Sequence, residues 1–227
     1  MLDAKAIVTI DGPSGAGKST ISRGLAAKLH FTYLDTGAMY RAVGLALKRQ
    51  SIDPADTASL KKCLAAIELT LVAPDGDDDV LVLLNGEDVS QAIRTPEMGL
   101  VASRVSANPL VREKLTALQR QLGEKGGIVA EGRDMGTVVF PGAACKFFLN
   151  ASAEERARRR QKQLAEKGQT VDYQEIMDQI SKRDYDDSRR QLAPLKPAPD
   201  AILVDSSSMD PEAVIDCMLA SIAKSAR

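Results

Sequence analysis

The sequence feature that most constrains the fold is a glycine-rich stretch, Gly12 to Ser19, which fits the pattern G-x-x-x-x-G-K-[ST]. A short apolar run at residues 6–10 precedes it and predicts a strand. Apolar residues then recur every four positions in residues 19–29 and predict a helix. This pattern cradles phosphate groups when it lies between a strand and a helix, so we expect a phosphate-binding loop.

Each residue type in this loop has a chemical reason. Glycines let the backbone turn so that successive N–H groups point inward, and the helix that follows presents its positive end. Lys18 is expected to reach the β and γ phosphates, and Ser19 offers a hydroxyl to Mg²⁺. The residues expected to contact a triphosphate such as ATP are Gly12, Pro13, Ser14, Gly15, Ala16, Gly17, Lys18, Ser19 and Thr20.

Composition narrows the class of protein. The 227 residues suffice for one domain with an inserted lobe, and 44% hydrophobic and 27% charged residues are typical of a globular chain. A net charge of -1 argues against binding a polynucleotide, and no apolar run approaches the ~20 residues that span a membrane. Three scattered cysteines and one histidine suggest neither disulfides nor zinc. We expect a soluble cytoplasmic monomer.

Further patterns predict an α/β fold. Compact apolar runs at residues 128–130, 146–149 and 202–204 are typical of parallel strands buried on both faces. Alternating residues from 67 to 73, and residues 80–84 before Asn85-Gly86, predict a small antiparallel β lobe. Predicted helices cover residues 38–48, 97–107, 110–122, 153–166 and 173–190, and a last helix opens at Asp210-Pro211.

The sequence gives little support for other kinds of functional site. A GTPase would carry Asn-Lys-x-Asp and Asp-x-x-Gly, which the sequence lacks, and the nearest equivalent of an ATPase's metal-binding aspartate is Glu131. Residues 77–79, three aspartates, are interpreted as a solvated turn rather than a metal cluster. His30 is interpreted as the end of the first helix, and Cys145 as a small core residue.

Arginines mark a second substrate. Arg183, Asp187 and Arg190 stand four and three residues apart, and this spacing predicts that all three lie on one face of the helix over 173–190. Asp35 and Gly132-Arg133-Asp134 follow predicted strands. Because ligands of open parallel sheets bind beyond the carboxyl ends of the strands, these residues should converge near the phosphate loop. A solvated, salt-bridged helix face is the simpler alternative for the three helical residues.

Three segments together resemble the bacterial cytidylate kinase family: DGPSGAGK at residues 11–18, LDTGAMYR at 34–41 and GRDMGTVVFP at 132–141. The similarity covers almost the whole chain, and further matching segments lie at residues 93–95, 111–112, 154–160 and 183–184. The resemblance implies a single nucleoside monophosphate kinase domain, with a core of about 1–62, 123–152 and 191–227. It also implies a CMP-binding insert of about 63–122 and a lid of about 153–190.

The activity that the resemblance implies is ATP-dependent phosphorylation of CMP and dCMP with Mg²⁺. Ser103, Arg112 and Asp134 match positions that read cytosine; Arg183 and Asp187 match positions near the sugar; Arg41, Arg133 and Arg190 match positions around the phosphates. Asp35 and Thr36 complete the expected CMP site, and Thr36 keeps the hydroxyl of the serine common in relatives. Lys18, Arg133 and Arg159 are the expected catalytic residues, and Arg159 is expected to contact ATP.

A predicted lid carries Arg156, Arg159 and Arg160 on one helix face, where closure would bring arginines onto the moving phosphoryl group. A carboxylate at Asp134 would accept from the cytosine N4 amino group but would face a carbonyl in uracil, so UMP should be disfavoured. Two rival functions are a related kinase for another nucleotide or a small acid such as shikimate, and a regulatory module that binds nucleotide without transfer.

Overall fold

The computed structural model describes residues 2–72, 80–166 and 168–225, and the predicted turn at 74–76 and the three aspartates at 77–79 lie outside them. The chain forms two compact units. The first comprises Met1–Leu34 and Lys125–Arg227, and the second comprises Asp35–Glu124. The boundaries proposed above for the insert and the lid stay predictions.

A five-stranded sheet forms the centre of the first unit, in the order β2-β6-β1-β7-β8. The strands are β1 (Ile7–Asp11), β2 (Thr32–Asp35), β6 (Ile128–Gly132), β7 (Cys145–Asn150) and β8 (Ile202–Asp205). β1 pairs in parallel with β6 and β7, and β7 pairs in parallel with β8. The predicted parallel sheet is therefore confirmed. Val8 and Thr9 of the central strand point to opposite faces of the sheet and are both fully buried, because the sheet is covered on both faces.

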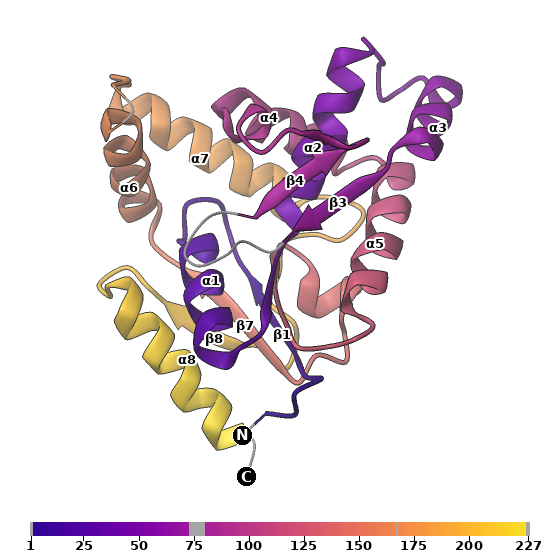
Figure 1. The fold of residues 1–227 in the computed structure, drawn as a ribbon. Coiled ribbons are helices and arrows are strands. Elements are labelled where there is room, and N and C mark those ends of the chain that lie inside the picture. Colours follow the sequence, from indigo (N-terminus) through magenta and orange to yellow (C-terminus); the bar gives the residue numbers. More distant parts are fainter. Residues whose placement is uncertain (1, 73–79, 167, 226–227) are drawn as a thin grey trace. The chain divides into compact units, whose positions relative to one another are not determined.

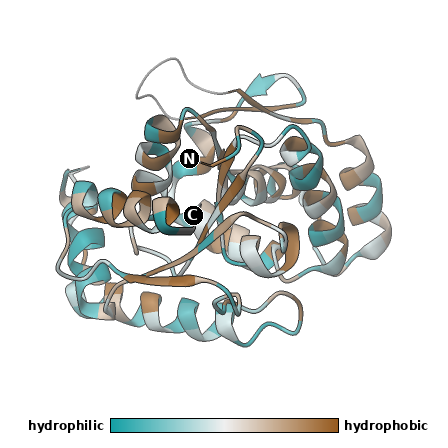
Figure 2. Ribbon diagram, turned by 90° about the horizontal axis from the view of Figure 1, so that it is seen from below, coloured by the Kyte–Doolittle hydropathy of each residue, from teal (hydrophilic) through white to brown (hydrophobic). Residues whose placement is uncertain are grey.

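Helices flank this sheet: α1 (Lys18–Leu29), α6 (Ala153–Glu166), α7 (Tyr173–Ser188) and α8 (Pro211–Ser225). α1 and α8 lie side by side, and their apolar faces share one core with β1 and β7 (Figure 1). Brown, apolar strand segments lie in the middle of the view, whereas the helices carry both apolar and hydrophilic segments (Figure 2). This separation places the charged helix faces in solvent.

Two predictions about helix ends have different outcomes. α1 ends as expected at His30, which adopts a left-handed conformation with φ 56° and donates its backbone N–H to carbonyls of the last turn. α7 ends at Ser188, so the prediction that Arg190 shares a helical face with Arg183 and Asp187 is wrong. Arg190 lies in the segment that follows Arg189, the carboxyl-terminal cap of the helix.

The second unit combines helices with a small antiparallel sheet in the order β3-β4-β5. Its strands are β3 (Leu69–Val72), β4 (Leu81–Leu84) and β5 (Glu87–Asp88). Its helices are α2 (Thr36–Arg49), α3 (Thr57–Ala66), η1 (Ala92–Arg94), α4 (Pro96–Val105) and α5 (Pro109–Gly123). The predicted antiparallel lobe is confirmed, while α3 was not predicted. Within the described ranges of both units, no helix is long and apolar enough to cross a membrane.

Candidate active site

The loop between β1 and α1 has the backbone that its glycines permit. Gly12, Gly15 and Gly17 have φ values of 153°, 80° and 91°. A Cβ atom on Gly12 would lie 2.0 Å from the Leu149 carbonyl oxygen, so no other residue fits there. α1 begins immediately afterwards at Lys18, and its positive amino-terminal end therefore faces the loop. The geometry is that of an anion-binding loop.

Lys18 is held inside this loop. Its Nζ donates a hydrogen bond of 2.7 Å to the Pro13 carbonyl, and the residue is only 8% exposed. Burial lowers the pKa of Lys18 to about 7, and the positive charges of Arg133 and Arg183 act in the same direction. The carboxylates of Glu131 and Asp11 oppose that shift. A bound phosphate would favour the charged ammonium form.

Ser19 supplies an oxygen beside a carboxylate. Its hydroxyl donates a 2.7 Å hydrogen bond to Glu131 Oε1, and the Tyr33 hydroxyl donates to the same oxygen at 2.7 Å. Among the described residues there is no cluster of three or more His, Cys, Asp or Glu side chains suited to a metal. The oxygens of Ser19 and Glu131 fit a Mg²⁺ ion that takes its remaining ligands from phosphate and water.

Glu131 was not among the predicted site residues, although the sequence carried a signal for it. Residues 128–130 form a buried apolar run that ends directly at this carboxylate. β6 neighbours β1, and Ile10 of β1 lies opposite Glu131 of β6. Glu131 is the second-last residue of its strand, and the hydrogen bond from Ser19 places it close to the phosphate loop. The order of strands, which the sequence did not reveal, gives the residue its place.

Arg133 and Arg190, both partly buried, form a charged cluster around the buried carboxylate of Asp187. Arg133 Nε donates a 2.9 Å hydrogen bond to Asp187 Oδ2, while Arg190 donates to Oδ1. Asp187 is 1% exposed; burial alone would raise its pKa, but the charges of Arg133 and Arg190 lower it below its ordinary value. Arg183 contributes in the same direction and also lowers the pKa of Lys18, so its guanidinium lies near both groups.

Two arginines of α6 contact the phosphate loop and its surroundings. Arg156 donates to the carbonyls of Ala151 (2.9 Å) and Ser14 (3.1 Å) and to Asp184 Oδ2 (2.7 Å). The bonds to Ser14 and Asp184 tie α6 to the loop and to α7, which indicates an anchoring role for Arg156.

Arg159 lies one turn further along α6. Its guanidinium donates to the Ser206 hydroxyl at 3.2 Å and to the Ser206 carbonyl at 2.6 Å. A Cβ atom added to Gly17 would lie 3.8 Å from the NH1 atom of Arg159. Arg159 is therefore within reach of a phosphate in the loop. Arg160 is half-buried, and burial lowers its pKa.

The second unit holds the remaining predicted CMP residues. Asp35 caps α2 by accepting from the Ala38 N–H at 2.8 Å, and Arg41 donates to its other oxygen at 3.1 Å. The Arg112 guanidinium lies 6.0 Å from the centre of the Tyr40 ring. Thr36 at the start of α2 is buried, and Ser103 lies on α4. Asp134, by contrast, belongs to the first unit, where it is buried beside Arg133.

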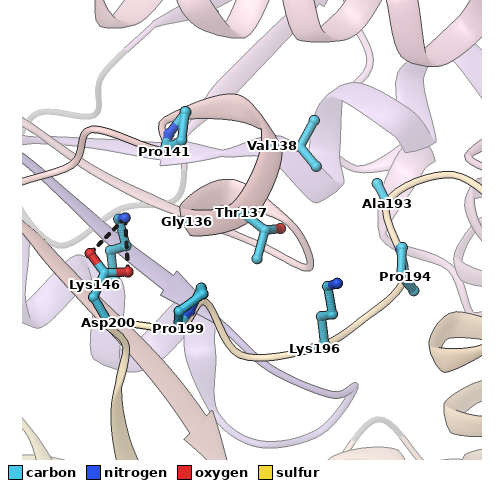
Figure 3. Close-up of a pocket in the computed structure, with 10 residues that line it drawn as sticks. All are labelled: Gly136, Thr137, Val138, Pro141, Lys146, Ala193, Pro194, Lys196, Pro199 and Asp200. Atoms are coloured by element: carbon cyan, nitrogen blue, oxygen red, sulfur yellow. Dashed lines mark hydrogen bonds and ion pairs between the residues drawn. The ribbon is translucent and has the colours of Figure 1, made fainter.

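A cavity of about 510 Å³ in the first unit is lined by none of the predicted site residues. Figure 3 shows its walls, formed by residues 136–138 and by the segment around residues 193–200. Lys146 Nζ donates to both oxygens of Asp200 at 2.9 and 2.8 Å. A Cβ atom added to Gly136 would lie 3.2 Å from the Lys146 Cδ atom, so the lysine stem packs against this glycine. The lysine of this cavity thus supports the turn after Asp134.

A phosphate loop at the end of the central strand, with its lysine among arginines of the same unit, defines a P-loop kinase. Residues 8–224 match the sequence model of the cytidylate kinase family. The chain therefore belongs to this family, whose activity is the phosphorylation of a nucleoside monophosphate.

Curated relatives agree over nearly the full length. The chain is 50% identical over 223 residues to "Cytidylate kinase" of Syntrophotalea carbinolica, covering 98% of this chain and 94% of that protein. It is 48% identical over 219 residues to "Cytidylate kinase" of Pseudomonas aeruginosa PAO1, covering 96% of each. An uncharacterized protein from Eubacterium ventriosum has a similar fold, with a TM-score of 0.52, 11% identity and coverage of 96% and 98%.

Proposed function

We propose that this kinase transfers the γ-phosphoryl group of ATP to CMP and dCMP, forming ADP with CDP or dCDP, in the presence of Mg²⁺. The observation that carries the proposal is the cluster in which Asp187 binds Arg133 and Arg190. Lys18 of the phosphate loop is close enough for the Arg133 charge to lower its pKa. Lys18, Arg133 and Arg190, the cations proposed to hold a donor and an acceptor phosphate, belong to one unit, and a module that only binds nucleotide would not need the second set.

Positioning and charge stabilisation supply the catalysis in this proposal. The loop N–H groups and Lys18 hold the donor phosphates, and an acceptor phosphate oxygen attacks the γ-phosphorus in line. No general base is needed, because the acceptor phosphate is already an anion. Bound Mg²⁺ would neutralise charge on the β and γ phosphates, and Ser19 and Glu131 are the residues that would hold it.

Arginines complete the charge balance. Arg133 is fixed by Asp187, so its planar guanidinium is oriented before a ligand binds, and orienting it at the moment of reaction costs little. Arg190 is fixed by the same carboxylate. Arg159 of α6 is proposed to act on the donor side, since its NH1 lies next to Gly17 of the loop.

Base recognition is proposed to use one hydrogen-bond acceptor, a carboxylate, and one hydrogen-bond donor, a guanidinium group. The buried carboxylate of Asp134 would accept from the cytosine N4 amino group, and Arg112 would donate to ring acceptors, with Ser103 as a further polar contact. Asp35, Thr36 and Arg41 are proposed to contribute around the CMP phosphate, and Arg183 with Asp187 around the sugar. We further propose that the protein is a cytoplasmic monomer, which sedimentation of the purified enzyme would test for oligomeric state.

A coupled assay for ADP tests the activity, with CMP, dCMP, UMP, AMP and shikimate supplied in turn. ADP formation that depends on CMP or dCMP supports the proposal. ADP formation only with another acceptor would favour a related kinase, and none with any acceptor would favour the regulatory module. Lys18→Ala should lose turnover far more than CMP affinity, whereas Lys28→Ala, an exposed lysine on the same helix, should retain both.

A further inference from the structure

Asp11, the last residue of β1, makes contacts that the mechanism above does not use. It is 3% exposed and directly precedes Gly12, where the phosphate loop begins. Its Oδ1 accepts from the Met135 N–H at 2.9 Å, and its Oδ2 accepts from the Gly136 N–H at 2.8 Å. One carboxylate therefore holds two successive peptide groups 124 and 125 positions away in the sequence.

Those two peptide groups begin η2 (Met135–Val139), the turn that directly follows Arg133 and Asp134. The Asp134 carbonyl accepts from two N–H groups further along the turn, at 2.9 and 3.2 Å. The turn is also closely packed: a Cβ atom on Gly136 would lie 3.0 Å from Thr9 Oγ1 and 3.2 Å from Lys146 Cδ. Figure 3 shows Gly136 and Lys146 within this region. The sheet thus gives the turn one closely fitted position.

We propose that Asp11 is a positioning residue, whose carboxylate fixes the turn and thereby the direction in which Arg133 and Asp134 point relative to the phosphate loop. The physical basis is a pair of charge-assisted hydrogen bonds from a rigid central strand. Through Asp11 the donor loop, which starts one residue later, and the segment proposed to recognise CMP share one anchor. The kinetic part of this inference rests on the proposed function, while the structural part does not.

Electrostatics agree with this placement. Burial raises the pKa of Asp11 to about 6, and the negative charge of Asp134 acts in the same direction. The two peptide N–H groups and the charge of Lys18 oppose that shift and keep Asp11 ionised at neutral pH. The hydrogen bonds to Met135 and Gly136 thus partly compensate for burying a charge.

Asp11→Asn tests the proposal with little change in size. An asparagine keeps one acceptor but turns an NH₂ donor toward one of the two peptide N–H groups, so two donors would face each other. We expect KM for CMP to rise by roughly tenfold or more, while KM for ATP stays within about twofold. Asp210→Asn is the matched control: Asp210 caps α8 by accepting from the Ala213 N–H at 2.8 Å, and asparagine caps equally well.

A second measurement does not depend on CMP activity. In the wild type, the amide protons of Met135 and Gly136 should shift in NMR spectra with an apparent pKa near 6, and in Asp11→Asn this titration should disappear. If the wild type fails to phosphorylate CMP, the proposed function falls, and the NMR titration alone still decides whether Asp11 holds the turn. Unchanged amide shifts and an unchanged KM for CMP in Asp11→Asn would overturn the inference.

Gly136→Ala covers the case in which Asp11→Asn does not fold. The added methyl group would meet Thr9 Oγ1 and Lys146 Cδ and displace the same turn while leaving the carboxylate in place. The same selective rise in KM for CMP is expected. Equal effects on CMP and ATP, or none on either, would show that the turn does not orient the acceptor site.

Discussion

Arg133 and Asp187 form a 2.9 Å ion pair across 54 positions of sequence, joining the residue after β6 to the last turn of α7. Asp187 also accepts from Arg190, so a single buried carboxylate orients two guanidinium groups. The cations expected around the phosphates are therefore held in place by an anion, which offsets part of their mutual repulsion.

Removing that anion should destabilise the fold. Asp187→Asn leaves two partly buried arginines without their carboxylate, so the free energy of unfolding should fall by roughly 3 kcal/mol. Urea denaturation followed by circular dichroism measures this change. Asp186→Asn is the control, because Asp186 is half exposed and lies 3.8 Å from Lys182, and its substitution should change stability little. Equal stability of the two variants would contradict the prediction.

The same carboxylate should give stability a pH dependence. The folded pKa of Asp187 lies below its unfolded value of 3.8. The contribution of Asp187 to the free energy of unfolding is therefore complete above pH 3.8 and is lost as the pH falls through the lower folded pKa. Wild type should lose more stability than Asp187→Asn as the pH is lowered from 5 to 3. Parallel curves of unfolding free energy against pH for the two proteins would show that Asp187 does not contribute to the pH dependence.

Triphosphate binding should take up protons through Lys18. Burial lowers the pKa of this lysine to about 7, so at pH 8 the unliganded side chain is mostly neutral, and bound phosphate raises the pKa again. Calorimetric titrations with ATP at pH 8, in two buffers of different ionisation enthalpy, should show uptake of up to about one proton. Lys18→Ala should abolish that uptake, and equal uptake in the variant would rule out Lys18 as the group.

Arg159 and Arg158 offer a matched comparison on one helix. Both donate to Glu155, but Arg159 also reaches Ser206 and the neighbourhood of Gly17, whereas Arg158 is 68% exposed. Arg159→Ala should lower kcat by on the order of a hundredfold, because a cation near the transferred group is lost. Arg158→Ala should leave kcat within about twofold. Similar rates for both variants would remove Arg159 from the catalytic residues.

Asp134 should decide between cytosine and uracil. Asp134→Asn can turn its amide NH₂ toward the uracil carbonyl, which removes the repulsion between two acceptors. The ratio of kcat/KM for CMP to that for UMP should therefore fall by about tenfold or more. Steady-state kinetics with both nucleotides measure the ratio, and a ratio equal to that of the wild type would assign base recognition to other residues.

Local sequence patterns determined the parts of the fold that depend on near neighbours. The glycines of the loop, the apolar run of β6 and the ending of α1 at His30 were predictable, because backbone conformation and burial of short segments follow from residue type and spacing. The end of α7 was not: Arg190 fits the helical spacing but lies beyond the helix, where it still reaches Asp187. The π-helical turn η2 carried no local signal either.

The sequence by itself thus determined a phosphate loop on a parallel sheet, and its resemblance to a family predicted the arginines that we propose lie around a second nucleotide. Only the tertiary structure decided which groups meet: Asp11 with the turn after Asp134, Ser19 with Glu131, and Arg156 with the Ser14 carbonyl. These partners are more than 100 positions apart in the sequence. Their contacts follow from the order of strands in the sheet and from helix packing, which local spacing does not encode.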